Sequence, residues 1–238
     1  MQTWEIAVVT VATAAGAMVQ GSIGIGLALV AGPLLVGIDP AFTPAPLMLG
    51  GQIVGVRHVI AERAHTDRRA LRRCLYGLPV GIAGALIVVR LVDARSTALL
   101  VGTMTVIAAV ALLAGAKVQR TPRVETVGGI AISFAAVSAG LPGPPAAVTF
   151  NDLAPNALRG TLSTFMLFIS SVGILGLTLT GSFGREELLR FVTLVPGILI
   201  GLFAARYLRP HLDNTWFRPL VLVIALAGGL ALLGRELL

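Results

Sequence analysis

Long apolar stretches separated by short polar segments run along the whole chain. Crossing a hydrocarbon layer of about 30 Å takes roughly 20 helical residues, and many of these stretches approach that length. The stretches are Ile6–Val19, Gly24–Ile38, Ala45–Ala61, Leu75–Val89, Ala98–Ala116, Thr126–Ala139, Pro145–Phe150, Thr161–Thr180, Leu188–Ala205 and Pro219–Leu233. The pattern predicts an all-α integral membrane protein with no separate soluble domain.

The composition supports the same class. Apolar residues make up 56% of the chain and charged residues 12%, whereas a soluble domain carries roughly 25% charged residues. Lipid acts as a solvent for that much apolar surface. The first stretch lacks a basic start and carries Glu5, so we read it as a retained span and not as a signal peptide. We expect a multi-pass protein of the cell inner (cytoplasmic) membrane.

The net charge of +7 does not indicate nucleic acid as a partner. Lys and Arg fall in short bursts beside apolar stretches and have few aromatic neighbours, as the positive-inside rule describes. The single cysteine, Cys74, excludes an internal disulfide and a multi-cysteine metal site. We therefore predict neither a metal nor a cofactor, and the oligomeric state, homo-oligomer included, is left open.

Two parts of the chain resemble each other. The stretch 78–84 (LPVGIAG) recurs as 195–201 (VPGILIG), and 21–24 (GSIG) aligns with 140–143 (GLPG) at nearly the same offset. The sequence thus predicts two pseudo-symmetric repeats, residues 1–118 and 119–238. Duplicated halves favour a transporter that exposes a central site alternately to each side, although pores and some enzymes are also duplicated.

The first segment of each half has the wrong length for simple spans. Trp4 to Val36 is about 33 residues, or roughly 50 Å of helix, which is too long for one span and too short for two. An interruption near 21–26 fits, either in a re-entrant hairpin or in a broken crossing helix, and the matching segment 126–150 is broken at 140–145. If both segments are hairpins, each half has three full crossings and the two halves are inverted relative to each other. Both termini then face the periplasm. Length favours this inverted arrangement.

The first break supplies candidate substrate-binding residues: Gln20, Gly21, Ser22, Gly24 and Gly26. Glycines let the backbone turn sharply and approach a ligand. A helix that begins inside the protein points free N–H groups and the positive end of its dipole at an anion, and Gln20 and Ser22 add side-chain donors. The alternative is that these glycines serve only close helix packing.

The second break adds Gly140, Pro142 and Gly143, followed by Asn151. Proline suits a first helical turn, where its missing N–H is no loss, but it leaves fewer donors for an anion. Asn151 either binds the ligand or caps the next segment.

Polar side chains inside two spans complete the candidates. Arg57 lies about one turn inside its apolar stretch, and an Arg at depth costs at least roughly 2.5–3.5 kcal/mol. It is either a counter-charge for an anion, with His58 as a proton-linked neighbour, or a side chain that reaches back to the headgroups. Gln52 has the same ambiguity. Ser170 and Ser171 lie in the corresponding span of the second half, where bonding to the helix backbone is the competing role.

These motifs resemble the TauE/SafE family, the sulfite exporter or TSUP group. The resemblance rests on the glycine-rich break at 21–26, the stretch 32–35 (GPLL), the basic loop with Thr66 and Asp67, and the prolines Pro79 and Pro196 with their following glycines. It implies a secondary transporter, often an exporter, for sulfite, sulfonates, sulfoacetate or related anions. Pro142, Pro144 and Pro145 depart from the family's usual glycine-rich second break, so the resemblance bears on transport more than on substrate.

The leading hypothesis is a secondary transporter, not an enzyme, for a small sulfur-containing or organic anion. An intramembrane serine hydrolase is an alternative, with Ser22 as nucleophile and His58 as base, but the sequence supplies no orienting partner. A structural membrane subunit of a larger complex is a further alternative.

Overall fold

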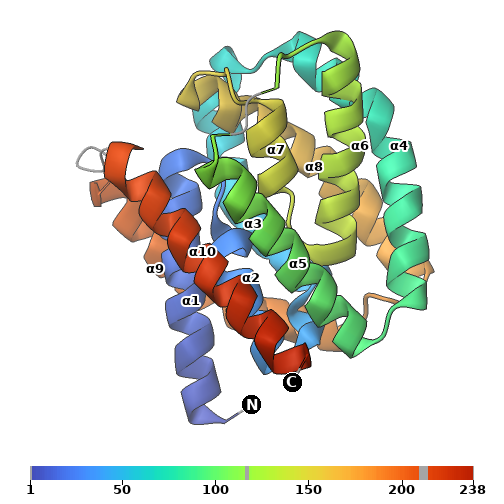
Figure 1. Cartoon of the computed structure of the whole chain (residues 1–238), viewed down its shortest axis with the longest axis vertical. Coiled ribbons are helices and arrows are strands. Elements are labelled where there is room, and N and C mark those ends of the chain that lie inside the picture. Colours follow the sequence, from blue (N-terminus) through green and yellow to red (C-terminus); the bar gives the residue numbers. More distant parts are fainter. Residues whose placement is uncertain (1, 116–117, 209–213, 238) are drawn as a thin grey trace.

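The computed structural model describes residues 2–115, 118–208 and 214–237, and these residues form helices but no strands. The helices are α1 (Thr3–Ile23), α2 (Leu27–Ile38), η1 (Pro40–Phe42), α3 (Ala45–Glu62), η2 (Arg63–His65), α4 (Arg68–Leu91), α5 (Ala94–Leu113), α6 (Pro122–Ala139), α7 (Gly143–Thr149), α8 (Pro155–Leu179), α9 (Arg185–Leu208) and α10 (Asn214–Leu237). Figure 1 shows them packed into one bundle, with both marked chain ends at the same end of it. The prediction of an all-α fold is confirmed for the described residues.

Six of the described helices are long and apolar enough to cross a membrane: α1, α4, α5, α8, α9 and α10. With six such helices, the chain is a multi-pass membrane protein. α3 has 18 residues but is not among the six. It carries Gln52, Arg57, His58 and Glu62, which lower its hydropathy.

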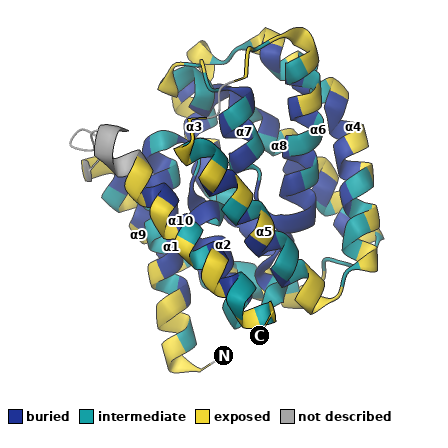
Figure 2. Cartoon of the chain, viewed as in Figure 1, coloured by how far each residue is buried: buried dark blue, intermediate teal, exposed yellow. Residues whose placement is uncertain are grey.

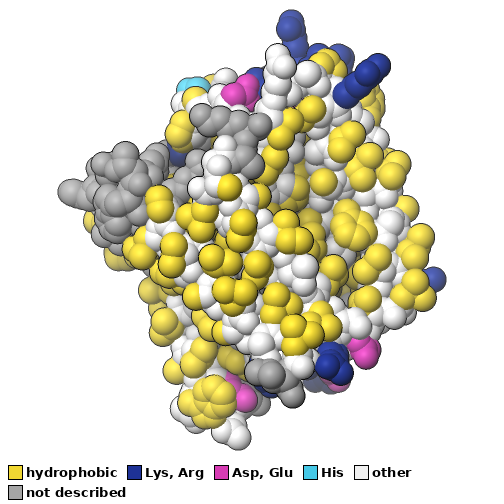
Figure 3. Space-filling model, viewed as in Figure 1, with side chains coloured by type: hydrophobic (Ala, Val, Ile, Leu, Met, Phe, Trp, Pro, Cys, Tyr) yellow, Lys and Arg dark blue, Asp and Glu magenta, His cyan; other side chains and the backbone are white. Residues whose placement is uncertain are grey.

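The outside of the bundle is apolar. Exposed residues follow the outward faces of the helices in Figure 2, and they include many large hydrophobic side chains, such as Ile60, Leu91 and Phe203. On the face drawn in Figure 3, hydrophobic side chains cover the middle, while Lys and Arg are grouped at the upper end and near the lower edge. An apolar band with cations at its borders is the surface that a lipid bilayer requires.

The first predicted break is present. α1 ends at Ile23 and α2 begins at Leu27. Gly24 and Gly26 have φ values of 94° and 153°, a region that L side chains rarely adopt, so only glycine reverses the chain here without strain. The N–H of Gly24 still bonds the carbonyl of Gln20 at 2.8 Å and closes the end of α1.

The second break follows the same logic. α6 ends at Ala139, and Gly140 has a φ of 69°. The N–H groups of Gly140 and Leu141 bond two carbonyls of the last turn of α6, which is the usual way a glycine ends a helix. α7 then begins at Gly143 and has only seven residues.

The broken segments pack against the opposite part of the chain. α1 lies along α9 and α6 lies along α4, while α3 lies beside α8 and α5 beside α10. The backbones approach closely where small residues face each other. A Cβ atom built on Gly129 of α6 would lie 2.7 Å from the Cα atom of Cys74 in α4, so no larger residue fits there.

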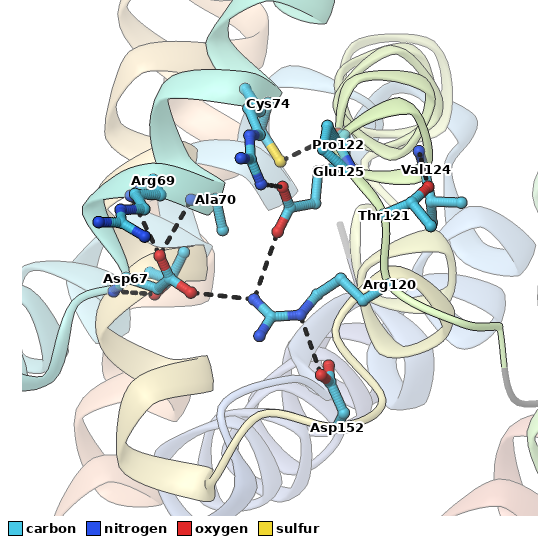
Figure 4. A network of polar contacts seen from close by, with 12 residues as sticks. Asp67, Arg69, Ala70, Cys74, Arg120, Thr121, Pro122, Val124, Glu125 and Asp152 are labelled. Atoms are coloured by element: carbon cyan, nitrogen blue, oxygen red, sulfur yellow. Dashed lines mark hydrogen bonds and ion pairs between the residues drawn. The ribbon is translucent and has the colours of Figure 1, made fainter.

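A network of ion pairs joins α4, α6 and the segment after α7 at one end of the bundle (Figure 4). Arg120 lies at its centre and donates to Asp67 at 2.9 Å, to Asp152 at 3.0 Å and to Glu125 at 3.3 Å. Arg73 donates to the other oxygen of Glu125 at 2.6 Å. The network ties the start of α4 to the start of α6.

Asp67 also caps α4, because one of its oxygens accepts the N–H groups of Arg69 and Ala70 at 3.0 Å each. Burial by itself raises the pKa of this carboxyl. The hydrogen bonds from the Ala70 N–H and from Arg120 outweigh that effect, and the pKa of Asp67 lies below its ordinary value of 3.8. The ionised form therefore stabilises this end of the bundle.

Candidate functional site

A small cavity lies between the two breaks and the helices α3 and α8, with a volume of about 50 Å³. The predicted site residues that line it are Gln20, Gly24, Gly26, Gln52, Gly140, Pro142, Gly143 and Ser170. Among the described residues that line it, none carries a charge. Segments that are far apart in the sequence thus enclose one buried space.

The breaks also touch each other. A Cβ atom built on Gly143, the first residue of α7, would lie 3.6 Å from the Cβ atom of Ile25. Ile25 lies between the two glycines of the first break and lines the cavity as well. The two interruptions are therefore neighbours in space and share one cavity wall.

Gln20 holds the first break in shape. Its side-chain oxygen accepts the N–H of Leu27 at 3.2 Å, and its side-chain nitrogen donates to the carbonyl of Gly51 in α3 at 3.3 Å. This uses one of the N–H groups at the start of α2. The next two residues, Ala28 and Leu29, line the cavity, and N–H groups in a first helical turn have no acceptor within the helix.

Gln52 crosses from α3 to α8. Its nitrogen donates to the carbonyl of Met166 at 3.1 Å and to the hydroxyl of Ser170 at 2.8 Å. Its oxygen is buried and, within the part of the chain that the structure describes, accepts no hydrogen bond. A buried acceptor without a donor is costly, and this one belongs to a residue that lines the cavity.

One protein family matches nearly the whole chain. The model of the sulfite exporter TauE/SafE family matches residues 8–232, which include both breaks and every residue that lines the cavity. The chain belongs to the TauE/SafE family. The family consists of membrane transporters, and the six candidate spans fit a membrane protein. No curated protein and no solved structure matches the chain.

Several predicted residues of this TauE/SafE chain lie outside the cavity. Gly21 is buried against α9. The hydroxyl of Ser22 donates to the carbonyl of Met18, and that of Ser171 donates to the carbonyl of Leu167, at 2.8 Å each. Both serines bond their own helix, which is the competing role that membrane helices often show.

Asn151 and Arg57 also lie away from it. The amide of Asn151 donates to the carbonyls of Val118 and Val148 at 2.8 and 2.9 Å and so closes the end of α7. Arg57 is exposed and reaches the carbonyl of Leu202 in α9 at 3.5 Å. Its position fits a side chain that extends toward the headgroups.

His58 lies just behind the cavity and is buried. Its Nδ1 atom lies 3.4 Å from the hydroxyl of Ser163, which lines the cavity, and its Nε2 atom lies 3.4 Å from the carbonyl of Gly21. Ser22 instead bonds Met18, so a Ser22–His58 pair of the kind a serine hydrolase needs receives no support.

The sequence reading missed a buried ion pair in this TauE/SafE chain. Arg159 of α8 donates to one oxygen of Glu62 in α3 at 2.8 and 3.2 Å, and to the carbonyl of Ser22 at 3.4 Å. Its stem packs on the first break, because a Cβ atom built on Gly24 would lie 2.6 Å from the Cγ atom of Arg159. In the sequence, Glu62 and Arg159 each lie at the border of an apolar stretch. That position is equally typical of a charge in a loop, so it does not indicate a buried ion pair.

Proposed function

We propose that this chain is a secondary transporter that exports a small sulfur-containing or organic anion, of the sulfite, sulfonate or sulfoacetate type, across the cytoplasmic membrane. The substrate occupies the cavity between the two breaks. The observation that carries the proposal is that both interrupted segments line one buried space. Interrupted helices that meet inside the bundle are a common substrate site in transporters.

The size of the cavity favours a small oxyanion. A cavity needs about 10–15 Å³ on this measure to hold one water, so about 50 Å³ accommodates only a few heavy atoms. Sulfite fits such a space as it stands, whereas a longer sulfonate requires the walls to move apart. Smaller anions are therefore expected to bind more tightly than larger ones.

The walls offer dipoles in place of a direct counter-charge. The first turn of α2 begins at Leu27 and presents backbone N–H groups and a positive dipole end, which favour an anion. The free acceptor of Gln52 favours an anion that carries a hydrogen-bond donor, such as hydrogen sulfite.

The two halves are, in this proposal, inverted repeats that rock around the cavity. Their exchanged packing supports it, since α1 lies along α9 and α6 along α4. The halves then expose the cavity alternately to the cytoplasm and the periplasm.

Uptake of labelled sulfite by liposomes that contain the purified chain tests the proposal. Gly143→Val should abolish uptake, because its side chain enters the cavity against Ile25. Gly234→Val is the matched control, since Gly234 lies in α10 with no atom within 4 Å of an added Cβ atom. Uptake by the wild-type chain alone also excludes a role as an obligate subunit.

Two results would contradict the proposal. One is a wild-type chain, folded in the liposome, that takes up neither sulfite nor any of the sulfonates. The other is wild-type uptake by a folded Gly143→Val protein.

A further inference from the structure

A polar path leads from the cavity to the end of the bundle. Ser163 lines the cavity and contacts His58, and Glu62 follows His58 by one helical turn on α3. Residues four apart on a helix share a face, with Cβ atoms about 5–6 Å apart. The second oxygen of Glu62 lies 3.6 Å from Nδ1 of His65, whose side chain is 52% exposed. Polar side chains therefore lie at intervals between the exposed His65 and Ser163 at the cavity wall.

The buried charges along this path balance each other. The side chains of Arg159 and Glu62 are only 5% and 10% exposed, and both donor contacts from Arg159 go to the same oxygen, Oε1. The other oxygen, Oε2, faces His65. An ionisable residue inside a membrane bundle is expensive, and it usually marks a transport pathway.

An incoming anion disturbs this balance. Gly24 lines the cavity and lies on the stem of Arg159, whose guanidinium bonds the carbonyl of Ser22. The cation therefore lies behind the cavity wall, and in a poorly screened interior its charge acts on an anion in the cavity as well as on Glu62. Two anions and one cation in a poorly screened space leave a negative charge without a partner. A proton on Glu62 restores neutrality.

We propose that Glu62 is the proton-binding site that couples this transporter to protons, and that Arg159 is shared between Glu62 and the substrate anion. One proton from solvent passes by way of His65 to Oε2 of Glu62 when the anion enters. When the anion leaves on the opposite side, the proton leaves Glu62 past His58 and Ser163 into the open cavity. Proton and anion thus move in the same direction. This inference rests on the transport function proposed above.

Several charged or polar groups of the described residues lie around Glu62. α8 presents Arg159, the following turn η2 presents His65, and α1 presents the backbone carbonyl of Ser22 next to Arg159. On α3 itself, His58 lies one turn back and Arg57 extends to α9. The α6 carboxylate of Glu125 is held separately by Arg73 and Arg120.

The test measures how the apparent affinity for sulfite depends on pH. Thermal stabilisation of the purified protein gives the sulfite concentration for half-maximal effect in the wild type, in Glu62→Gln and in Glu125→Gln. Sulfite ionises equally in all three samples, so its own titration cancels in the comparison. Glu125 is the matched control, because it is also a buried carboxylate paired with arginine, but its partners are Arg73 and Arg120 and not the Arg159 that packs on the first break.

The wild type and Glu125→Gln should lose about tenfold more affinity per unit rise in pH than Glu62→Gln does, because one linked proton gives that slope. Glu62→Gln should also bind sulfite more tightly near neutral pH, because Arg159 then lacks its competing carboxylate. If Glu62→Gln does not fold, the uncharged pair Glu62→Gln with Arg159→Met replaces it. This variant also lacks the cation shared with the anion, so it should bind sulfite more weakly at every pH and should lack the extra slope.

Equal slopes in the three proteins would overturn the coupling role of Glu62 while sulfite binding and uptake stand. A wild-type chain that neither binds nor takes up sulfite would instead remove the transport function itself. The two failures are therefore distinguishable.

Discussion

Removal of the guanidinium of Arg159 should destabilise the protein strongly. Arg159→Met keeps most of the unbranched stem that packs on Gly24, but it removes two donors from Glu62 and one from the carbonyl of Ser22. Glu62 then remains buried without the guanidinium that balances its charge. Breaking a buried ion pair in this way costs about 3–5 kcal/mol.

This loss of unfolding free energy can be measured as a fall in melting temperature. For a chain of this length, 1 kcal/mol corresponds to about 2–4 °C, so the apparent Tm should fall by roughly 6–20 °C. The assay is thermal unfolding in detergent at neutral pH, followed by tryptophan fluorescence. Arg190→Met is the control, because the pair of Arg190 with Asp39 is more exposed and such pairs contribute about 0–1 kcal/mol.

A double-mutant cycle with Glu62→Gln isolates the pair. The double variant should be more stable than Arg159→Met alone, because it leaves no unpaired buried charge. Two results together would contradict this description of the Glu62–Arg159 pair. In that case Arg159→Met melts at the same temperature as Arg190→Met, and the double variant is no more stable than Arg159→Met.

Three further changes have separate outcomes. Gly129→Val should not yield folded protein in size-exclusion chromatography, because its side chain meets the backbone of Cys74, whereas Gly84→Val, with only ordinary side-chain contacts, should fold. Asp67→Asn keeps the cap of α4 but not the charge. Because the pKa of Asp67 is lowered, the wild type's stability advantage over this variant should be complete above pH 3.8 and disappear as the pH falls below it, as melting temperatures would report. Arg57→Ala should retain sulfite uptake in liposomes, since Arg57 is exposed and outside the cavity lining; loss of uptake in a folded variant would restore it to the site.

The sequence predicted the breaks well, because their cause is local. Glycines at 24, 26 and 140 permit a positive φ, and they interrupt stretches whose length does not fit whole spans. The structure places the first break at the end of a 21-residue helix, so α1 is itself long enough to span and only α2 is short. The length of the whole segment did not predict how its residues divide between α1 and α2.

The faces of the helices were harder to predict. The position of Arg57 in the sequence indicated how far it lies inside its apolar stretch. The apolar residues of α3 lie on several sides of the helix, so their pattern does not show which face meets the cavity. Arg57 points outward, while Gln52 and His58 point inward. The serines had the same problem, since Ser170 faces the cavity and its neighbour Ser171 does not.

The ion pair of Glu62 and Arg159 was not predictable from one sequence. The two residues are 97 positions apart, and each lies at the border of an apolar stretch, where charges are ordinary. Only the packing of α3 on α8 brings them together beside the first break. Long-range polar contacts of this kind have no local pattern.

The most direct test of the substrate site is the position of a bound anion in a crystal. Selenite has the shape and charge of sulfite, and its selenium atom can be located by anomalous scattering. We expect one selenium peak inside the cavity, between Gly26 and Gly143 and within hydrogen-bonding reach of Gln52. A peak at the exposed side chain of Arg57, or a cavity without selenium in crystals that hold it elsewhere, would contradict the account.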